Sequence, residues 1–376
     1  MPGASADRFA ACGPADLPWA SLAGPLVAAE DALARLDERL RAGAAGEGWI
    51  ARSHFADACA SLWIEGELVA LEDLVLHDAG MDIHAPTPQL IRARAIVGAR
   101  RVIAAQPSGW ALSPEGFARL HGEGERPQTR LPGAEIADAR APEATDENAA
   151  LDSALALIDA ALARSAQALA RSAQALAGEA RAEGGTRREP LPAADPDEAA
   201  QLAAWRRMAA VMDGLPPVIA AGLLWDAWET APPVRRGAWL GRQIVADYLR
   251  QRGKTLAHLP CLNTGLRLSP WERRRSPDRA TRLAAWCEAV RACAAAGLRE
   301  HDRLTLAISL LERKCANRRT TSRLPALIAL ATRRPLVTAG TVAQALAVSP
   351  RAAQGLIAEL GLRETTGRGR YRAWAL

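Results

Sequence analysis

The sequence predicts a mainly α protein, in which a multi-helix bundle is followed by a C-terminal winged helix-turn-helix domain. Ala, Leu and Arg are abundant, whereas Val, Ile, Tyr and Phe are scarce beside them, and this bias favours helix over strand. Apolar residues recur at helical spacing along much of the chain. The 376 residues are enough for two or three domains. These observations argue against a large β-sandwich or a parallel α/β sheet.

The N-terminal region, residues 1–120, contains the first group of expected helices. Leucines at helical spacing mark the earliest one, and capping residues mark the later ones: Ser53, Thr87 with Pro88, and Ser113 with Pro114. The expected helices span Pro25–Arg41, Ser53–Leu68, Val69–His77, Thr87–Gln106 and a segment that starts at Ser113.

Residues 121–198 are expected to be a linker, because the segment is largely polar and rich in Gly, Pro, Glu and Asp. Within it, the heptad Ala-Arg-Ser-Ala-Gln-Ala-Leu at residues 163–169 is repeated without change at residues 170–176. Leu169 and Leu176 continue one seam, which predicts a single amphipathic helix or a short coiled-coil face.

Residues 199–320 are expected to form the second part of the helical body. Five tryptophans of its helices are expected to pack in the core: Trp205, Trp225, Trp228, Trp239 and Trp286. The expected helices span Ala199–Met212, Pro217–Trp228, Leu240–Arg252, Arg279–Ala296 and His301–Lys314.

The last segment, residues 321–376, predicts a helix-turn-helix. Thr338 can cap a short helix, Ala347-Val348 makes a tight turn, and Ser349 with Pro350 starts a second helix that Gly361 terminates. Arg and Gln side chains read guanine and adenine edges in the major groove. The residues of the second helix predicted to face DNA are Ser349, Arg351, Gln354 and Gly355.

A wing is expected after the second helix, because two short strand-like runs flank Gly367-Arg368-Gly369. The predicted DNA contacts of the wing are Arg368, Arg370 and Arg372. The charge of the chain agrees with this assignment. The whole chain has a net charge of +5, but residues 313–376 carry 12 basic and two acidic residues, which leaves −5 for residues 1–312. A basic end on a mildly acidic body is typical of a protein that binds nucleic acid.

Two segments resemble one protein family. Residues 334–376 closely resemble the C-terminal winged-helix domain that follows many bacterial Fic proteins, the AMP-transferring family. Ser61-Leu62-Trp63-Ile64-Glu65-Gly66 is similar to the Ser-x-x-x-Glu-Gly inhibitory helix of that family, whose glutamate pairs with an arginine of the catalytic loop and blocks productive ATP binding. The resemblance implies a Fic-like body in which Ser61, Glu65 and Gly66 belong to an inhibitory-type helix.

The catalytic loop of the resembled family reads His-Pro-Phe-x-x-Gly-Asn-Gly-Arg, commonly followed by Leu-Gly-Arg. The best match here runs from Ala231 to Trp239 and is followed by Leu240-Gly241-Arg242. Ala231 stands where the family has its catalytic histidine, and Trp239 stands where it has its phosphate-binding arginine. Without the imidazole this position offers no general base, so the resemblance implies a degenerate body, and no catalytic residue is predicted.

The leading hypothesis is a cytoplasmic transcriptional regulator that binds double-stranded DNA and carries a catalytically inactive Fic-like body. Two alternatives stay open: a divergent nucleotide transferase whose base comes from elsewhere, and an interaction module whose winged helix binds protein. Whether the chain is an enzyme is therefore undecided, with Ala231 and Trp239 as the evidence against it. A homodimer is also left open.

No cofactor or metal is predicted. The six cysteines form no CxxC pair, the six histidines do not cluster, and neither a P-loop nor an HExxH motif occurs. The chain has no run of about 18 apolar residues that could span a membrane. Its first residues lack the basic and apolar regions of a signal peptide, which is why the cytoplasm is the expected location.

Overall fold

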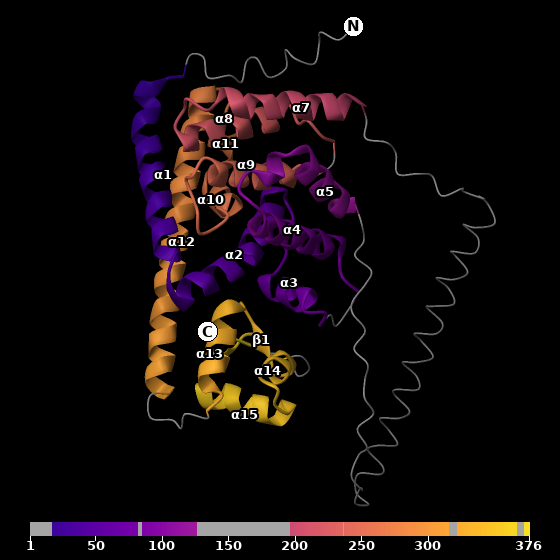
Figure 1. Ribbon diagram of the computed structural model, residues 1–376, viewed down its shortest axis with the longest axis vertical. Coiled ribbons are helices and arrows are strands. Elements are labelled where there is room, and N and C mark those ends of the chain that lie inside the picture. Colours follow the sequence, from indigo (N-terminus) through magenta and orange to yellow (C-terminus); the bar gives the residue numbers. More distant parts are fainter. Residues whose placement is uncertain (1–16, 82–84, 126–195, 236, 316–321, 367–371) are drawn as a thin grey trace, which may run out of the picture. The chain divides into compact units, whose positions relative to one another are not determined.

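The computed structural model describes residues 17–81, 85–125, 196–235, 237–315, 322–366 and 372–376, which are mostly helical (Figure 1). Within these ranges the strands are three short ones near the C-terminus, so the expected mainly α class is confirmed. No helix in the described ranges is long and apolar enough to cross a membrane. The duplicated heptad at residues 163–176 and most of the expected linker lie outside them.

The first group of helices lies in residues 17–125. Thr87 caps α4 as expected, because its side chain accepts a hydrogen bond from the Leu90 amide, and Pro88 fills the first turn. Ser113 likewise accepts from the Gly116 amide at the start of α5. The elements are α1 (Trp19–Leu40), α2 (Gly43–Ile64), α3 (Leu71–Asp78), α4 (Pro88–Ala105), the 3₁₀ turn η2 (Trp110–Leu112) and α5 (Pro114–Glu125).

Two of the expected starts in this group are wrong. Helix α1 begins at Trp19, not at Pro25, because Leu22 adds one more turn to its buried face. Helix α2 begins at Gly43 and ends at Ile64, so Ser53 lies in its middle, where the hydroxyl donates to the Ile50 carbonyl instead of capping. A serine can cap a helix or bond back within one, and sequence spacing does not separate the two cases.

The second group of helices fills residues 196–315. One expectation is wrong here: the two helices predicted over Arg279–Ala296 and His301–Lys314 are one 37-residue helix, α12, and α1 lies along it (Figure 1). The elements are α7 (Pro196–Val211), α8 (Pro217–Thr230), α9 (Trp239–Gln251), α10 (Leu262–Leu268), α11 (Trp271–Arg274) and α12 (Arg279–Cys315).

Gly297 shows why α12 is continuous although its sequence suggests a break. A Cβ at this position would lie 2.7 Å from Leu36 Cδ2 and 3.0 Å from Trp49 Cζ2. The glycine therefore gives α1 and α2 room to approach α12 closely, and this packing offsets the low helix propensity of glycine.

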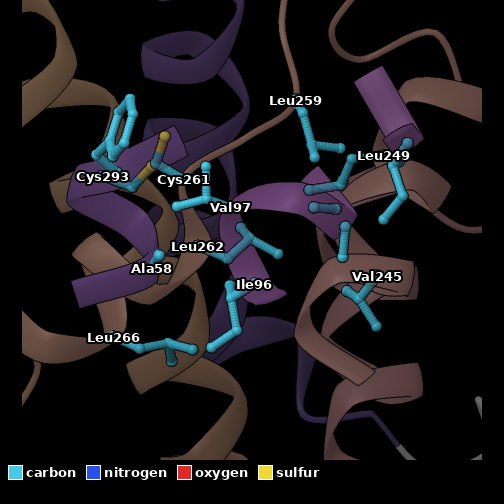
Figure 2. Close-up of a cluster of buried hydrophobic side chains, with 14 of the residues drawn as sticks. Ala58, Ile96, Val97, Val245, Leu249, Leu259, Cys261, Leu262, Leu266 and Cys293 are labelled. Carbon is cyan, nitrogen blue, oxygen red and sulfur yellow. The ribbon is translucent and has the colours of Figure 1, made fainter. Parts of the chain in front are cut away.

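The core of the body joins helices from both groups. Figure 2 shows Ile96 and Val97 of α4 in the same cluster as Val245 of α9 and Leu262 of α10. The tryptophans expected in the core are buried at positions 205, 228, 239 and 286, whereas Trp225 is partly exposed. The rings of Trp205 and Trp228 pack edge to face, with their centroids 5.0 Å apart. The indole nitrogens of Trp205 and Trp286 each donate a hydrogen bond to a backbone carbonyl of α8.

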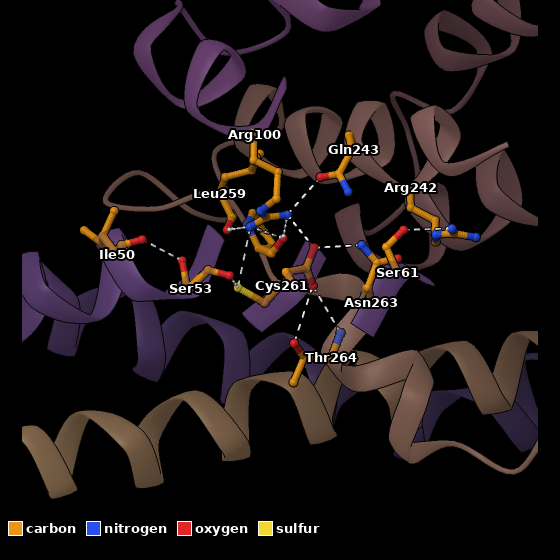
Figure 3. Close-up of polar contacts among 12 residues, drawn as sticks. Ile50, Ser53, Ser61, Arg100, Arg242, Gln243, Leu259, Cys261, Asn263 and Thr264 are labelled. Atoms are coloured by element: carbon orange, nitrogen blue, oxygen red, sulfur yellow. Dashed lines mark hydrogen bonds and ion pairs between the residues drawn. The ribbon is translucent and has the colours of Figure 1, made fainter. Parts of the chain in front are cut away.

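A buried polar network crosses this core (Figure 3). Arg100 of α4 and Asp57 of α2 form a fully buried ion pair, with Nη1 and Oδ2 2.6 Å apart. Arg100 also donates to Gln243 Oε1 at 2.9 Å, and Asn263 donates to Asp57 at 2.7 Å. The network therefore ties α2, α4, α9 and α10 together.

A second buried acid holds the segment before α10. Asp37 of α1 accepts hydrogen bonds from the Leu256 and Ala257 amides and lies 2.9 Å from His258 Nδ1. Burial by itself raises the pKa of Asp37, but the bonds from His258 and the two amides outweigh it and lower that pKa to about 2.

The last elements form a three-helix unit with a small sheet. Both strand pairings are antiparallel in the order β1-β3-β2, and Trp374 of β3 pairs with Val337 on one side and Glu364 on the other. The elements are α13 (Leu324–Arg333), β1 (Val337–Thr338), α14 (Ala339–Leu346), α15 (Pro350–Leu360), β2 (Arg363–Glu364) and β3 (Ala373–Ala375).

Candidate nucleic-acid interface

The first helix of the expected helix-turn-helix is α14, and local hydrogen bonds fix both of its ends. Thr338 and Thr341 form a reciprocal capping box, in which each hydroxyl accepts from the other residue's amide, at 3.1 and 2.8 Å. The helix ends at Ala347, which has a φ of 52°. This left-handed residue reverses the chain, at a cost of about 1–2 kcal/mol for a non-glycine residue.

The second helix, α15, starts and ends where the sequence predicts. Ser349 Oγ accepts from the Ala352 amide at 3.2 Å, and Pro350 occupies the first turn. Gly361 ends the helix with a φ of 75°. Ala353, Ile357 and Leu360 are buried and hold α15 against the unit. The Ser349 hydroxyl, predicted to face DNA, thus also has a structural role as a cap.

The other residues predicted for this helix lie on its outer face. Arg351, Gln354 and Gly355 are all exposed. Arg351 and Gln354 are three residues apart, so their side chains extend from neighbouring positions of one face. A Cβ at Gly355 would meet nothing within 4 Å. The glycine therefore leaves an open place on this face that a side chain would otherwise fill.

The wing is described on both strands but not at its tip, so Arg368 and Arg370 lie outside the described residues. Arg372 is exposed and donates through Nε to Glu364 Oε1 at 2.8 Å, while its guanidinium lies 5.4 Å from the Trp374 ring centre. The bond to Glu364 raises the pKa of Arg372, and the same bond lowers the pKa of Glu364. The Arg372 charge is thus balanced within the wing.

In the body, the structure brings the residues of the Ser-x-x-x-Glu-Gly segment against α9. Arg242 Nη2 donates to Ser61 Oγ at 3.0 Å and to Glu65 Oε1 at 2.5 Å. Arg242 is buried, with 3% of its side chain exposed, while 25% of the Glu65 side chain is exposed. Gly66 has a φ of 85° and lies just after the end of α2, where the chain reverses.

The two positions at which the resembled family has catalytic residues lie at the two ends of the loop between α8 and α9. Ala231 follows the last turn of α8 and is partly buried, and Trp239 is buried at the start of α9. Within the described residues no group of His, Cys, Asp and Glu side chains is placed to hold a metal ion.

Sequence reasoning missed the contacts that join the body to the winged-helix unit. Arg52 of α2 donates from Nε to the Thr332 carbonyl at 2.8 Å and from Nη2 to the Ala331 carbonyl at 2.6 Å. These carbonyls belong to the last turn of α13, where a cation is favoured. Gly48 permits the approach, because a Cβ there would lie 2.7 Å from the Thr332 oxygen. Gly48 itself was the available signal of close packing, since a glycine inside a helix often marks a place where another element approaches.

Two family descriptions match this chain. Residues 324–376 match an HTH DNA binding domain, which agrees with α13 to β3 and gives the chain a DNA-binding domain. Residues 192–316 match a family described as Protein of unknown function (DUF1612), which covers α7 to α12.

The chain is also similar along most of its length to one curated protein. Uncharacterized protein y4cF of Sinorhizobium fredii (strain NBRC 101917 / NGR234) is 44% identical to it over 362 residues, covering 91% of this chain and 93% of the relative. The chain therefore belongs to the family of this Sinorhizobium fredii protein, and within it combines a DUF1612 segment with a C-terminal helix-turn-helix DNA-binding domain.

Proposed function

We propose that the protein is a transcriptional regulator that reads a double-stranded operator with α15. The observation that carries the proposal is the placement of Arg351 and Gln354, exposed side by side on a helix whose start is fixed by the turn at Ala347 and the cap at Ser349. Arg pairs bidentately with guanine and Gln with adenine in the major groove, so the two side chains have the chemistry for base readout.

The wing supplies the phosphate contacts in this proposal. Arg368 and Arg370 would contribute positive charge near the backbone, which sets affinity and position without carrying sequence information. Arg372 contributes less positive charge to the DNA contact than its exposure suggests, because the Glu364 carboxylate already balances its guanidinium. The net positive charge of residues 313–376 favours DNA over a protein partner for this unit.

For the body, we propose a Fic-like helical arrangement that has lost AMP transfer. The contact of Arg242 with Ser61 and Glu65 supports the arrangement, since it pairs the Ser-x-x-x-Glu-Gly glutamate with the arginine of the trailing Leu-Gly-Arg. Ala231 and Trp239 support the loss of activity, because neither side chain can take a proton from a hydroxyl or bind phosphate by charge.

Genomic footprinting of the full-length tagged protein tests the regulatory proposal. We expect protected sites that share a sequence and lie upstream of genes, and we expect Arg351→Ala with Gln354→Ala to remove them. A matched change on α1, Arg35→Ala, controls for the loss of an exposed arginine, since 72% of that side chain is exposed and it pairs locally with Asp31. A folded full-length protein that protects no site would favour the protein-interaction alternative.

A further inference from the structure

A cavity of about 630 Å³ lies between the helical body and the winged-helix unit. Helices α2 and α3 supply one side of it through Ile50, His54 and Leu76, and the segment after α13 supplies the other through Leu336 and Thr338. Its volume is in the range of sites that hold drug-sized ligands, and such sites are mostly apolar with a few polar groups.

One polar side chain that lines this cavity has a ring nitrogen without a hydrogen-bond partner among the described residues. His54 is buried, with 6% of its surface exposed, and its Nδ1 has no hydrogen-bond partner among the described residues. A buried polar atom without a partner is costly, so a group that completes its hydrogen bonding binds there with an advantage. Four of the other charged linings are engaged with one another: Arg101 binds Asp78 through two bonds of 2.9 Å, and Arg333 pairs with Glu47. Arg334 also lines the cavity and is exposed.

The chemistry of His54 narrows the ligand class. Burial, together with the nearby charges of Arg100 and Arg101, lowers the pKa of His54 to about 3, so the imidazole is neutral at physiological pH. The carboxylates in the cavity lining, Asp78 and Glu47, are both paired with arginines. A neutral imidazole nitrogen either donates or accepts a hydrogen bond, depending on the tautomer. A ligand hydroxyl group can pair with it in both cases, because a hydroxyl both donates and accepts. The apolar walls favour an aromatic frame for that hydroxyl.

We infer that this cavity binds a small aromatic hydroxy compound and that the bound compound changes the affinity of the winged helix for DNA. The second part of this inference, the change in DNA affinity, rests on the proposed function. Because the walls come from both the body and the winged-helix unit, any shift of one against the other alters the cavity. A ligand that fits one arrangement better therefore shifts the protein toward that arrangement. Arg52 and Glu47 join the two units beside the cavity, which gives such a shift defined contacts to break.

Equilibrium dialysis of the full-length protein against 2-naphthol and 2-methylnaphthalene tests the site. The two probes have similar shape and differ in the hydroxyl. We expect wild type to bind 2-naphthol about two- to tenfold more tightly, the worth of one net hydrogen bond. His54→Phe should remove that preference, and Ala51→Phe, which fills the cavity, should weaken the binding of both probes. Ala44→Phe is the control, because Ala44 lines a separate hollow beside α1 and α12.

The site is refuted if wild type binds neither probe, if it shows no preference for 2-naphthol, or if Ala51→Phe binds as wild type does. The comparison of two probes on wild type keeps the test decisive even if a variant does not fold.

Fluorescence anisotropy with a duplex selected from random sequences tests the regulatory half. We expect saturating 2-naphthol to change the DNA affinity of wild type and Ala44→Phe at least fivefold, the lower end of measured allosteric couplings, and to leave Ala51→Phe unaffected. Unchanged DNA affinity in the presence of bound probe would overturn the regulatory half. If neither wild type nor Ala44→Phe binds any duplex, the DNA-reading proposal itself fails, and the dialysis result still decides the cavity.

Discussion

The Arg242 guanidinium lies 2.5 Å from the Glu65 carboxylate, a contact between two residues 177 positions apart in the chain. Ser61, one turn before Glu65 on α2, accepts a second bond from the same nitrogen, and Trp225 lies 5.6 Å from the guanidinium (Figure 3 shows Ser61 and Arg242). This contact joins the end of α2 to the start of α9, close in sequence to Trp239, the first residue of α9.

The first prediction concerns the stability of this contact. Glu65→Ala should lower the free energy of unfolding by about 1–3 kcal/mol, because it leaves a buried guanidinium with Ser61 as its remaining bonded partner. Glu67→Ala is a matched control: its carboxylate is equally exposed, but its partner Arg92 is 46% exposed, so the expected loss is below about 1 kcal/mol. Urea denaturation followed by circular dichroism measures both, and equal losses would contradict the prediction.

The second prediction concerns AMP transfer. Incubation with labelled ATP should place no label on the protein itself or on lysate proteins, because Ala231 provides no base. The same result is expected for Glu65→Gly, which frees Arg242 and thus removes any inhibition by the glutamate. Label above a heat-killed control in either protein would support the nucleotide-transferase alternative instead.

The third prediction separates base readout from phosphate contacts. Arg351→Ala and Gln354→Ala should each cost about 1–3 kcal/mol at particular base pairs of a selected operator. Arg368→Ala and Arg370→Ala should weaken binding to all sequences alike and flatten its dependence on salt. Anisotropy titrations of the full-length protein at several salt concentrations, on the operator and on point-substituted duplexes, measure both effects. The two classes of variant behaving alike would show that α15 does not read bases.

The fourth prediction concerns the ion pair at the centre of the body. Arg100→Met should destabilise the fold by about 3–5 kcal/mol, since Asp57 is left as an uncompensated buried charge. Adding Asp57→Leu to this variant should recover part of the loss, because the remaining charge is removed as well. A double-mutant cycle by chemical denaturation measures the coupling. A double variant no more stable than Arg100→Met alone would contradict this account.

The fifth prediction concerns pH. The pKa of His54 falls from 6.5 to about 3 in the fold, so below pH 6.5 the unfolded chain binds a proton that the folded chain does not. Stability is therefore lost as pH falls from about 6.5 toward 3, by up to about 1.4 kcal/mol per pH unit for this group. Asp37, whose pKa falls from 3.8 to about 2, extends the loss below pH 4.

His54→Phe provides the control for the pH dependence. Denaturation curves at pH 7, 6 and 5 should show a shallower fall in stability for this variant than for wild type, whatever its absolute stability. An identical slope in the two proteins would show that His54 is not held neutral by the fold.

The sequence by itself determined the two helices of the helix-turn-helix closely, although it did not show α13 before them. The ends of α14 and α15 are set by residues within four positions of one another: Thr338 with Thr341, Ser349 with Ala352, and Gly361. Capping and left-handed turns depend on local backbone geometry, so short-range spacing is enough to predict them. The exposed placement of Arg351 and Gln354 follows from the same periodicity.

Tertiary structure alone decided the rest. Gly297 suggests a break until Leu36 and Trp49 are seen packed against it, and Ser53 suggests a cap until its hydroxyl is seen bonded inside α2. The Asp57–Arg100 pair, the Arg242–Glu65 contact and the junction beside His54 join residues far apart in the chain. Such partners are chosen by helix packing and by the cost of burying polar groups unpaired, and neither of these is visible in local sequence spacing.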